Sequence, residues 1–597
     1  MVIFGKKAKK YREKRQNVPH TVDDSQRPGN ISNLFKNNYD NLYNCVSFDE
    51  NEMINLKNDI NKMISEKSGE GFDNCSVVVH PEEVKNAINK LKCGKTDASL
   101  PLRSDNLIFS SDICHGHLSL LFTMMLKHGF SPMGMLIGTM VPIPKGRYTD
   151  LANSKNFRAI TISSLLGKLL DLIVLSKEEQ NLITNDLQFG FKSGASTTMC
   201  TTMVRETISY YVNRGSNVYS LVLDATKAFD RVNYCKLFRI LLSRNICPFI
   251  CRLLLNMYIN QKLRVRWGNA YSDEFTVTNG VKQGGVISPI LYCVYIDGLI
   301  SELIKSNVGC FMGGAYAGIF YYADDLKTLA PSVRAMRTML SICLNYAERY
   351  DVKFNDKSQL IVYKSKVDDI PVPTVKINGA ELQAVESVMH LGHILNEHIF
   401  ECDASKCVKD FNVQTNLFLS DFKNASSFIR NYLFFKYCTS FYGSQFLPIY
   451  NNRIMNSLYV AWRMAVRRVW RIPWTSHSIL LPHITGTMPP DLTFAKRSIS
   501  FINFLLNSNN KTVKMITGMG LYSRHSIIGK NFKYLTARYE LNSNNVLNVW
   551  NNMCNEQLNQ IRISEQIKEL CSVRDSYQPH FLSRPQLKVM IDHICTY

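Results

Sequence analysis

Apolar and polar residues are spaced in two different ways along this chain. From about residue 77 to residue 363, short apolar runs of strand length alternate with segments whose apolar residues recur every three to four positions. Such alternation of strands and amphipathic helices is typical of an α/β catalytic region. Beyond about residue 405 the helical spacing dominates. The pattern therefore predicts an α/β region followed by a mainly helical one, without internal repeats.

Two of the apolar runs end in carboxylates. Residues 218–223 lead directly into Asp224, and the run Ile319–Tyr322 is followed, after one alanine, by Asp324 and Asp325. Adjacent aspartates at a tight turn repel each other unless something compensates their charge. A pair of divalent cations is the usual compensation, and metals held by carboxylates drive phosphoryl and nucleotidyl transfer. A polymerase is the first hypothesis.

The net charge points to the class of partner. The 597 residues include 70 Lys and Arg against 49 Asp and Glu, a formal net charge of +21. An excess this large indicates an acidic polymer as the partner, and a basic protein without such a partner is the plain alternative. The hydrophobic content of 45% is enough for several packed cores.

Cysteines and apolar stretches argue against other classes. The seventeen cysteines include no Cys-x-x-Cys pair, which favours reduced thiols inside a cell over a disulfide framework or structural zinc. The first residues turn basic at once, so no signal peptide is predicted. The most apolar stretches, near 118–143 and 159–176, are interrupted by charges, so we expect no membrane span. We expect an intracellular protein, in the nucleus, the cytoplasm or both.

Three further segments carry groups that suit a nucleotide. Residues 142–147 (PIPKGR) and 156–161 (NFRAIT) place cations on neighbouring strand-like stretches, where they could clamp a triphosphate. Residues 279–289 (NGVKQGGVISP) combine adjacent glycines, which let the backbone approach a ligand, with a lysine and a glutamine. Taken singly, each is equally consistent with surface charge or a glycine-rich start of a helix. Residues 94–96 (GKT) lack the earlier glycine of a phosphate-binding loop.

Together, these segments resemble the reverse transcriptases, most closely those of non-LTR (LINE-type) retrotransposons. The resemblance rests on LVLDATKAFDRVNY, NGVKQGGVISPILYCVYID and FYYADDLKTLA, supported by PIPKGR, NFRAIT, QFGFKSGAST and HLGHIL. It covers roughly residues 80–490, and the motifs are specific jointly where each alone is not. It implies an α/β (α+β) right-hand polymerase with a palm sheet, fingers, a helical thumb and a helical C-terminal region.

The resemblance implies roles for individual residues. Asp224, Asp324 and Asp325 are expected to be catalytic and to bind two magnesium ions, with manganese as an alternative. The backbone carbonyl of Ala225 is expected to complete the coordination, and Phe229 to be the steric gate against ribonucleotides. The other nucleotide-binding residues implied are Lys145, Arg158, Gln283, Gly284 and Lys357.

The mechanism implied is attack of a primer 3′-hydroxyl on the α-phosphate of a deoxynucleoside triphosphate, without a covalent enzyme intermediate. One metal would lower the pKa of the hydroxyl, and the other would stabilise the leaving pyrophosphate. Leu391 and Gly392 resemble the primer grip of the family. The partners implied are a template RNA, a DNA primer and deoxynucleoside triphosphates, and the oligomeric state is left open.

Residues 459–474 (YVAWRMAVRRVWRIPW) predict an amphipathic helix in the thumb. One stripe of this helix is apolar, and tryptophans at this spacing usually pack in a core. Its members are Trp462, Val466 and Trp470. The neighbouring stripe is cationic and is expected to follow a nucleic-acid backbone. Its members are Arg463, Arg467 and Arg471.

Four segments are expected: a basic, polar, linker-like stretch at 1–75, fingers and palm at 76–385, a thumb-like helical region at 386–500 and a helical extension at 501–597. The basic run at 6–15 suits nuclear targeting or nucleic-acid contact, although a solvated charge run is the more common explanation of such a stretch. The first stretch is too short for the endonuclease domain of complete LINE-type proteins, so we expect a truncated or cellular copy. Two alternatives stay open: a catalytically silent, retroelement-derived nucleic-acid-binding protein, and an intron maturase-like protein.

Overall fold

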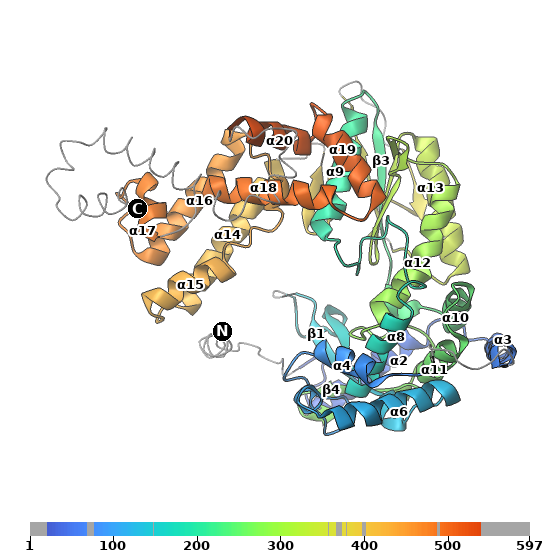
Figure 1. Ribbon diagram of the computed structural model, residues 1–597. Helices are drawn as coiled ribbons and strands as arrows, with labels where there is room; N and C mark the ends of the chain where they lie inside the picture. Colours follow the sequence, from blue (N-terminus) through green and yellow to red (C-terminus); the bar gives the residue numbers. More distant parts are fainter. Residues whose placement is uncertain are drawn as a thin grey trace, which may run out of the picture.

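The computed structural model describes residues 19, 21–68, 77–146, 149–355, 357–365, 373–377, 379–396, 401–485 and 490–538. These residues form an arc in which fingers, palm and thumb follow one another (Figure 1). The basic run at 6–15, Arg147 and residues 539–597 lie outside the described residues.

The palm is built on a five-stranded sheet in the order β14-β11-β3-β10-β9. Its central strand β3 is an apolar run that ends in a carboxylate, and it pairs antiparallel with both β10 and β11. The strands are β3 (Val218–Asp224), β9 (Ile319–Tyr322), β10 (Asp325–Ala330), β11 (Gln359–Tyr363) and β14 (Gln383–Ala384). The α/β class that the sequence predicts is confirmed.

Three helices share one buried core with the palm sheet. They are α9 (Thr197–Val212), α12 (Ser288–Lys305) and α13 (Val333–Arg349). Serine caps begin two of them: Ser196 accepts from the Met199 N–H ahead of α9, and Ser332 accepts from the Ala335 N–H ahead of α13. These helices and strands give the palm an interior from which only its strand ends and turns emerge.

The fingers contain a second sheet, in the order β2-β1-β4-β5, with β6 paired to β4. Its strands are β1 (Ile137–Pro144), β2 (Phe157–Ile162), β4 (Lys262–Trp267), β5 (Ala270–Tyr271) and β6 (Phe275–Thr276). The accompanying helices are α4 (Pro81–Asn89), α5 (Ser104–Ile108), α6 (Asp112–His128), α7 (Met133–Leu136), α8 (Leu165–Lys177), α10 (Tyr234–Ser243) and α11 (Pro248–Ile259). Two short 3-10 turns lie beside the sheets: η1 (Ser154–Asn156) and η2 (Ala228–Arg231).

The expected N-terminal linker is instead partly structured. Residues 21–68 carry helices α2 (Pro28–Tyr43) and α3 (Glu50–Ser68), and both pack into the cores of the fingers. In α2, Phe35 stacks on Trp267 of β4 at 5.3 Å between ring centroids. The few apolar residues of this polar stretch fall on one helical face, and that face is what the sheet covers. Low average hydrophobicity concealed this pattern.

The thumb is helical, as expected. Its elements are α14 (Glu401–Asp421), α15 (Ser427–Tyr437), η3 (Ser444–Phe446), α16 (Asn452–Trp470), η4 (Ser478–Leu480) and α17 (Leu481–Thr485). Trp462 and Val466 of α16 are buried in the thumb core, and Trp470 packs partly buried against it. The apolar stripe that the sequence predicts on this helix is therefore confirmed as core.

Residues 490–538 join the thumb to the palm rather than extending away from them. They form α18 (Pro490–Leu506), α19 (Lys511–Tyr522) and α20 (Ile527–Arg538), which lie over α9 and α16 in Figure 1. Ile502, Val513 and Ile528 belong to the palm core, whereas Phe494 and Leu535 belong to the thumb core. This helical group is shared by two cores.

Three two-stranded hairpins complete the described structure. They are β7 (Phe311–Met312) with β8 (Ala315–Tyr316), β12 (Lys376–Ile377) with β13 (Ala380–Glu381), and β15 (Ser387–His390) with β16 (His393–Asn396). Among the helices described, none has both the length and the apolar character that a membrane crossing requires.

Candidate active site

The three predicted carboxylates lie where paired strands of the palm end. Asp224 is the last residue of β3 and Asp325 is the first of β10, and the antiparallel register sets them directly opposite each other. Asp324 precedes Asp325 in the two-residue turn between β9 and β10. Since directly opposed residues of an antiparallel pair point to one face of the sheet, Asp224 and Asp325 share a face. The strand register thus gathers acids from distant parts of the chain.

A buried glutamine holds the turn that carries Asp324. The side-chain oxygen of Gln188 accepts hydrogen bonds from the N–H of Ala323 at 3.1 Å and from that of Gly190 at 2.8 Å. Ala323 has a φ of 59°, in the left-handed region that is unfavourable for a residue with a Cβ. Gly190 lies so close to the turn that a side chain there would collide with the Ala323 backbone. The segment QFGF therefore supports the strained turn at Ala323 and Asp324, which is called the catalytic turn below after its predicted role.

A second segment holds Asp224. The side-chain amide of Asn355 donates to the Asp224 carboxylate at 2.6 Å, and the Asn355 N–H donates to the Asp224 carbonyl at 3.0 Å. Ala225, whose carbonyl the resemblance assigns to a metal, is buried and forms a β-bridge with Phe354. The chain after α13 thus fixes the end of β3 through backbone and side chain together.

Burial and mutual repulsion disfavour the charged form of the acids. Burial, together with the charges of Asp324 and Asp224, raises the pKa of Asp325 to about 6. Burial and the charge of Asp224 also raise the pKa of Asp324, while its own backbone and Arg158 act in the opposite direction. A bound cation stabilises carboxylates that are buried and repel one another in this way.

Cations surround the acids on the side of the fingers. Arg158, on β2, lies close enough to Asp324 to lower its pKa. Burial is the largest cause that lowers the pKa of Lys145, which follows β1, and nearby cations lower it further. These cations are Arg158, Lys357 and Lys227. Cations held close together repel one another, and a bound anion offsets that repulsion. The group therefore suits a triphosphate.

Phe229 is held between two other aromatic rings. Its ring stacks on Tyr292 of α12, with centroids 4.8 Å apart and 19° between the planes, and Tyr292 is 1% exposed. Phe191 meets Phe229 edge to face at 6.3 Å and 84°. The Phe229 carbonyl also accepts from the Val281 N–H at 2.7 Å. Packing on rigid neighbours is what a gating ring needs, and the gate role stays a prediction.

Gln283 is engaged within the protein. Its side-chain amide donates to both carboxyl oxygens of Asp230, at 2.9 and 3.1 Å, and its carbonyl accepts from the Thr161 N–H at 2.7 Å. Asp230 is 4% exposed, and burial raises its pKa to about 6. Gly284 has a φ of 110° and stands against the Thr161 carbonyl, where a side chain would collide. Gln283 thus connects β2 to η2, and its predicted contact with a nucleotide stays a prediction.

The hairpin that resembles a primer grip lies beside the catalytic turn. Leu391 and Gly392 form its two-residue tip, with φ values of 49° and 83°. The hydroxyl of Tyr442 donates to the Leu391 carbonyl at 2.9 Å, and its ring stacks on His393. The pKa of Tyr322, two residues before Asp324, is raised by burial and also by Tyr442. Tyr442, which supports the hairpin tip, thus also lies near strand β9, the strand that leads into Asp324.

The predicted arginines of α16 meet different surroundings. Arg467 donates to the Ser476 carbonyl at 2.8 Å and to the Ser478 hydroxyl at 2.9 Å, which uses its guanidinium inside the thumb. Arg463 is half-buried. Arg471 is exposed and follows the helix in a left-handed conformation, with a φ of 56°. Of the three, Arg471 has the exposure that contact with a nucleic-acid backbone requires.

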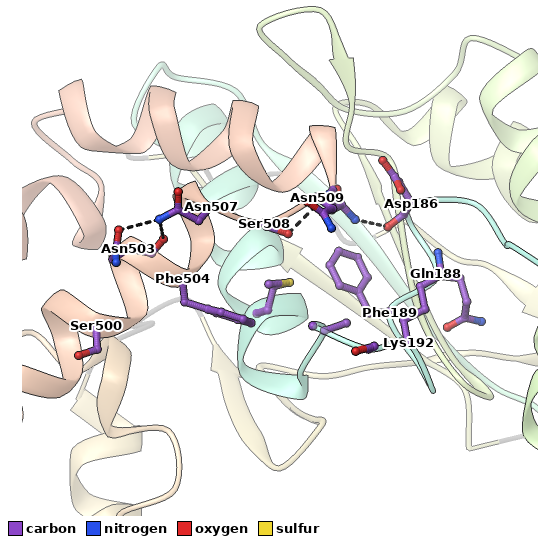
Figure 2. A pocket seen from close by; sticks show the side chains of 15 residues that line it. Asp186, Gln188, Phe189, Lys192, Ser500, Asn503, Phe504, Asn507, Ser508 and Asn509 are labelled. Carbon is purple, nitrogen blue, oxygen red and sulfur yellow. Dashed lines mark hydrogen bonds between the residues drawn. The ribbon is translucent and has the colours of Figure 1, made fainter. Parts of the chain in front are cut away.

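A pocket of about 420 Å³ lies behind the segment that supports the catalytic turn. Figure 2 shows it between α18, which contributes Asn503 and Phe504, and the segment that contains Gln188 and Lys192. None of the three carboxylates lines this pocket. It is therefore distinct from the site of the acids, and its neighbour α19 bonds to the supporting segment through Asn510, at 2.5 Å from the Asp186 carbonyl.

The same span of residues matches a known family. The profile of the family described as "Reverse transcriptase (RNA-dependent DNA polymerase)" matches residues 143–395, which contain all three acids, Phe229 and the primer-grip-like hairpin. The chain carries a reverse transcriptase domain. The matched span takes in the whole palm sheet and the fingers sheet apart from most of β1.

Proteins similar to this chain come from mobile elements. The chain is 25% identical over 332 residues to the RNA-directed DNA polymerase from mobile element jockey of Drosophila funebris, covering 53% of this chain and 35% of that protein. It is 24% identical over 244 residues to the Retrovirus-related Pol polyprotein from type-2 retrotransposable element R2DM of Drosophila melanogaster, covering 41% and 23%. The chain thus spans about a third or less of the length of these two relatives. A solved telomerase structure from Candida albicans aligns over 65% of each chain with 12% identity and a TM-score of 0.32.

Reverse transcriptases generally use divalent metal ions, and the three acids within the matched span have suitable chemistry. Carboxylate oxygens are the hard ligands that magnesium prefers. Within the described part of the chain, no three His, Cys, Asp or Glu side chains are already gathered around one point. The Asp224 carboxylate is turned to the Asn355 amide instead. The donor atoms of the three acids are therefore chemically suited to a divalent cation, and one Asp224 oxygen also accepts from Asn355.

Sequence reasoning did not assign several residues that shape the site. Gln188 lies in a motif that the resemblance includes, yet its role depends on contact with a turn far along the chain. Asn355 is next to the predicted Lys357, and Lys227 lies between Ala225 and Phe229. The sequence signal that could have identified Gln188, Asn355 and Lys227 is their position within or next to recognisable motifs. Tyr442 lies outside every motif, and no sequence pattern marks it.

Proposed function

We propose that this reverse transcriptase domain is an active RNA-directed DNA polymerase of the non-LTR retrotransposon type. It extends a DNA primer on an RNA template with deoxynucleoside triphosphates. One observation carries the proposal: Asp224, Asp324 and Asp325 meet at adjoining strand ends and face a group of cations with no other counter-charge among the predicted site residues. Acids and cations divided in this way suit a metal–triphosphate complex.

The acids would hold the magnesium ions. Asp224 and Asp324 are the proposed principal ligands, with Asp325 and the Ala225 carbonyl assisting. When bound, the ions supply activation of the primer hydroxyl and stabilisation of the leaving pyrophosphate. The raised pKa of Asp325, about 6, supports this assignment, because bound cations relieve the repulsion that raises it.

The other residues position the reactants. Arg158 and Lys145 bind the triphosphate, with Lys357 beside them, and Phe229 excludes a ribose 2′-hydroxyl by its bulk. The hairpin tip at Leu391 holds the primer end near the catalytic turn. The formal charge of +21 favours binding of the nucleic-acid backbone, with the salt dependence that such binding carries.

Primer extension tests the proposal directly. The purified chain is incubated with magnesium, deoxynucleotides and an RNA template annealed to a labelled DNA primer, and extension to the template end is expected. Replacing magnesium by a chelator should abolish the product. Salt-sensitive binding of the RNA–primer duplex without any extension would instead identify a catalytically silent nucleic-acid-binding protein.

A further inference from the structure

Phe191 combines three properties that a merely packed phenylalanine does not show. It has a φ of 57°, in the left-handed region where a large side chain is unfavourable. Its side chain is 49% exposed, and it belongs to neither the palm core nor the fingers core. Strain and exposure at one aromatic residue indicate that its position is maintained for something other than burial.

The backbone immediately before Phe191 is tied to the catalytic turn. The Phe189 N–H donates to the Tyr321 carbonyl at 2.8 Å, and the Gly190 N–H donates to the side chain of Gln188 at 2.8 Å. Gln188 in turn accepts from the Ala323 N–H. The conformation of residue 191 is therefore set by the same contacts that set the position of Asp324.

The ring of Phe191 is directed at the predicted gate. It meets Phe229 edge to face at 6.3 Å and 84°, while Tyr292 supports Phe229 from another side at 4.8 Å. Edge-to-face contacts fix the orientation of a ring more than they add burial. The half-buried Phe229 ring has these two aromatic neighbours. Of these two neighbours, Tyr292 is buried and Phe191 is exposed.

We infer that Phe191 is a positioning residue for sugar selection. Its ring holds Phe229 in the orientation that excludes a 2′-hydroxyl, and its backbone couples that orientation to the catalytic turn. The inference deepens the proposed polymerase function and depends on it. It predicts that discrimination between deoxynucleotides and ribonucleotides requires the rings of both Phe191 and Phe229. The backbone conformation at residue 191, in contrast, should persist when either ring is removed.

The experiment compares Phe191→Gly with Phe191→Tyr. Glycine accepts the left-handed backbone, so this variant keeps the fold and removes only the ring. The ratio of kcat/KM for a deoxynucleotide over the matching ribonucleotide should fall roughly three- to tenfold in Phe191→Gly, the range of an edge-to-face ring pair. Phe191→Tyr, which keeps the ring, should restore the wild-type ratio. Phe109→Leu, at a distant exposed phenylalanine, should leave it unchanged.

A double variant and a binding measurement separate this inference from the polymerase proposal. In Phe229→Ala, adding Phe191→Gly should lower the ratio no further, because the two rings act as one unit. Binding of each nucleotide to a complex with a dideoxy-terminated primer, in calcium, reports the same selection without chemistry. If extension fails but this binding ratio falls in Phe191→Gly, the inference survives and the activity does not. An unchanged ratio in Phe191→Gly, or no nucleotide binding, overturns it.

Discussion

The palm carries two strained hairpin tips that are held in different ways. The catalytic turn has Ala323 at a φ of 59°, and the grip-like turn has Leu391 at 49°. Gln188, which is fully buried and belongs to the palm, holds the first. Tyr442, which is 53% exposed and lies between thumb helices, holds the second.

The two kinds of support suit two functions that must act at one place, metal binding and primer holding. A turn held by a buried amide of its own lobe keeps its geometry whatever the thumb does, as metal ligands require. The second turn is held by an exposed phenol that also contacts the Thr197 hydroxyl of palm helix α9 at 2.6 Å, so its position depends on how the thumb sits against the palm. We therefore expect changes at the first turn to affect the chemical step and changes at the second to affect primer binding.

The largest expected effect is at the catalytic turn itself. Asp324→Asn removes a proposed metal ligand and should lower kcat for primer extension by at least about a thousandfold. Primer–template affinity, measured by fluorescence anisotropy at fixed salt, should change little. Extension close to the wild-type rate would contradict the assigned mechanism.

Removal of the buried support should have the next largest effect. Gln188→Ala leaves the N–H groups of Ala323 and Gly190 without their acceptor, at about 1–3 kcal/mol for each buried donor. The turn should relax, and kcat should fall roughly 10- to 100-fold because the ligands are misplaced. The dissociation constant of the primer–template should stay near that of the wild type. A variant that loses affinity and keeps kcat would reverse the proposed division between the two turns.

The thumb-side support should show the opposite pattern. Tyr442→Phe removes the hydrogen bond to the Leu391 carbonyl and the one shared with the Thr197 hydroxyl. A hydrogen bond is worth about 0.5–1.5 kcal/mol, so primer–template affinity should weaken roughly two- to tenfold. The value of kcat at saturating primer should change less than affinity does. Tyr437→Phe, at a tyrosine of α15 with similar exposure, is the matched control. Equal effects of the two substitutions would show that the Tyr442 hydroxyl has no special part in primer binding.

The smallest effect concerns stability and pH. Asp325 titrates near pH 6 in the folded protein and near 4 in an unfolded chain, so the folded state binds the extra proton between these values. The stability of the metal-free protein should therefore fall as the pH rises from about 4 to about 6. Asp325→Asn should raise the thermal midpoint at pH 7.5 and leave it unchanged near pH 4, as scanning fluorimetry can measure. A lower midpoint at pH 7.5 would show that Asp325 stabilises the turn.

Local pattern was enough to predict that the three acids lie at strand ends. Asp224 ends an apolar run, Asp324 and Asp325 follow another, and these runs are strands because buried strands need apolar residues on both faces. The stripe through Trp462 on α16 was readable for the same reason. Helices α2 and α3 were missed, because a polar stretch with few apolar residues resembles a linker until other elements cover its apolar face. The fingers sheet covers that of α2, and helices α10 and α11 cover that of α3.

The sequence alone therefore determined which residues carry charge, ring or metal-ligand chemistry, and in which order, since these are properties of side chains and of their nearest neighbours along the chain. The tertiary structure alone decided that Asp325 stands opposite Asp224, that Gln188 and Tyr442 hold the two tips, and that residues 490–538 serve two cores. Contacts of this kind join residues distant in sequence, and they form only when strand register and helix packing are settled together.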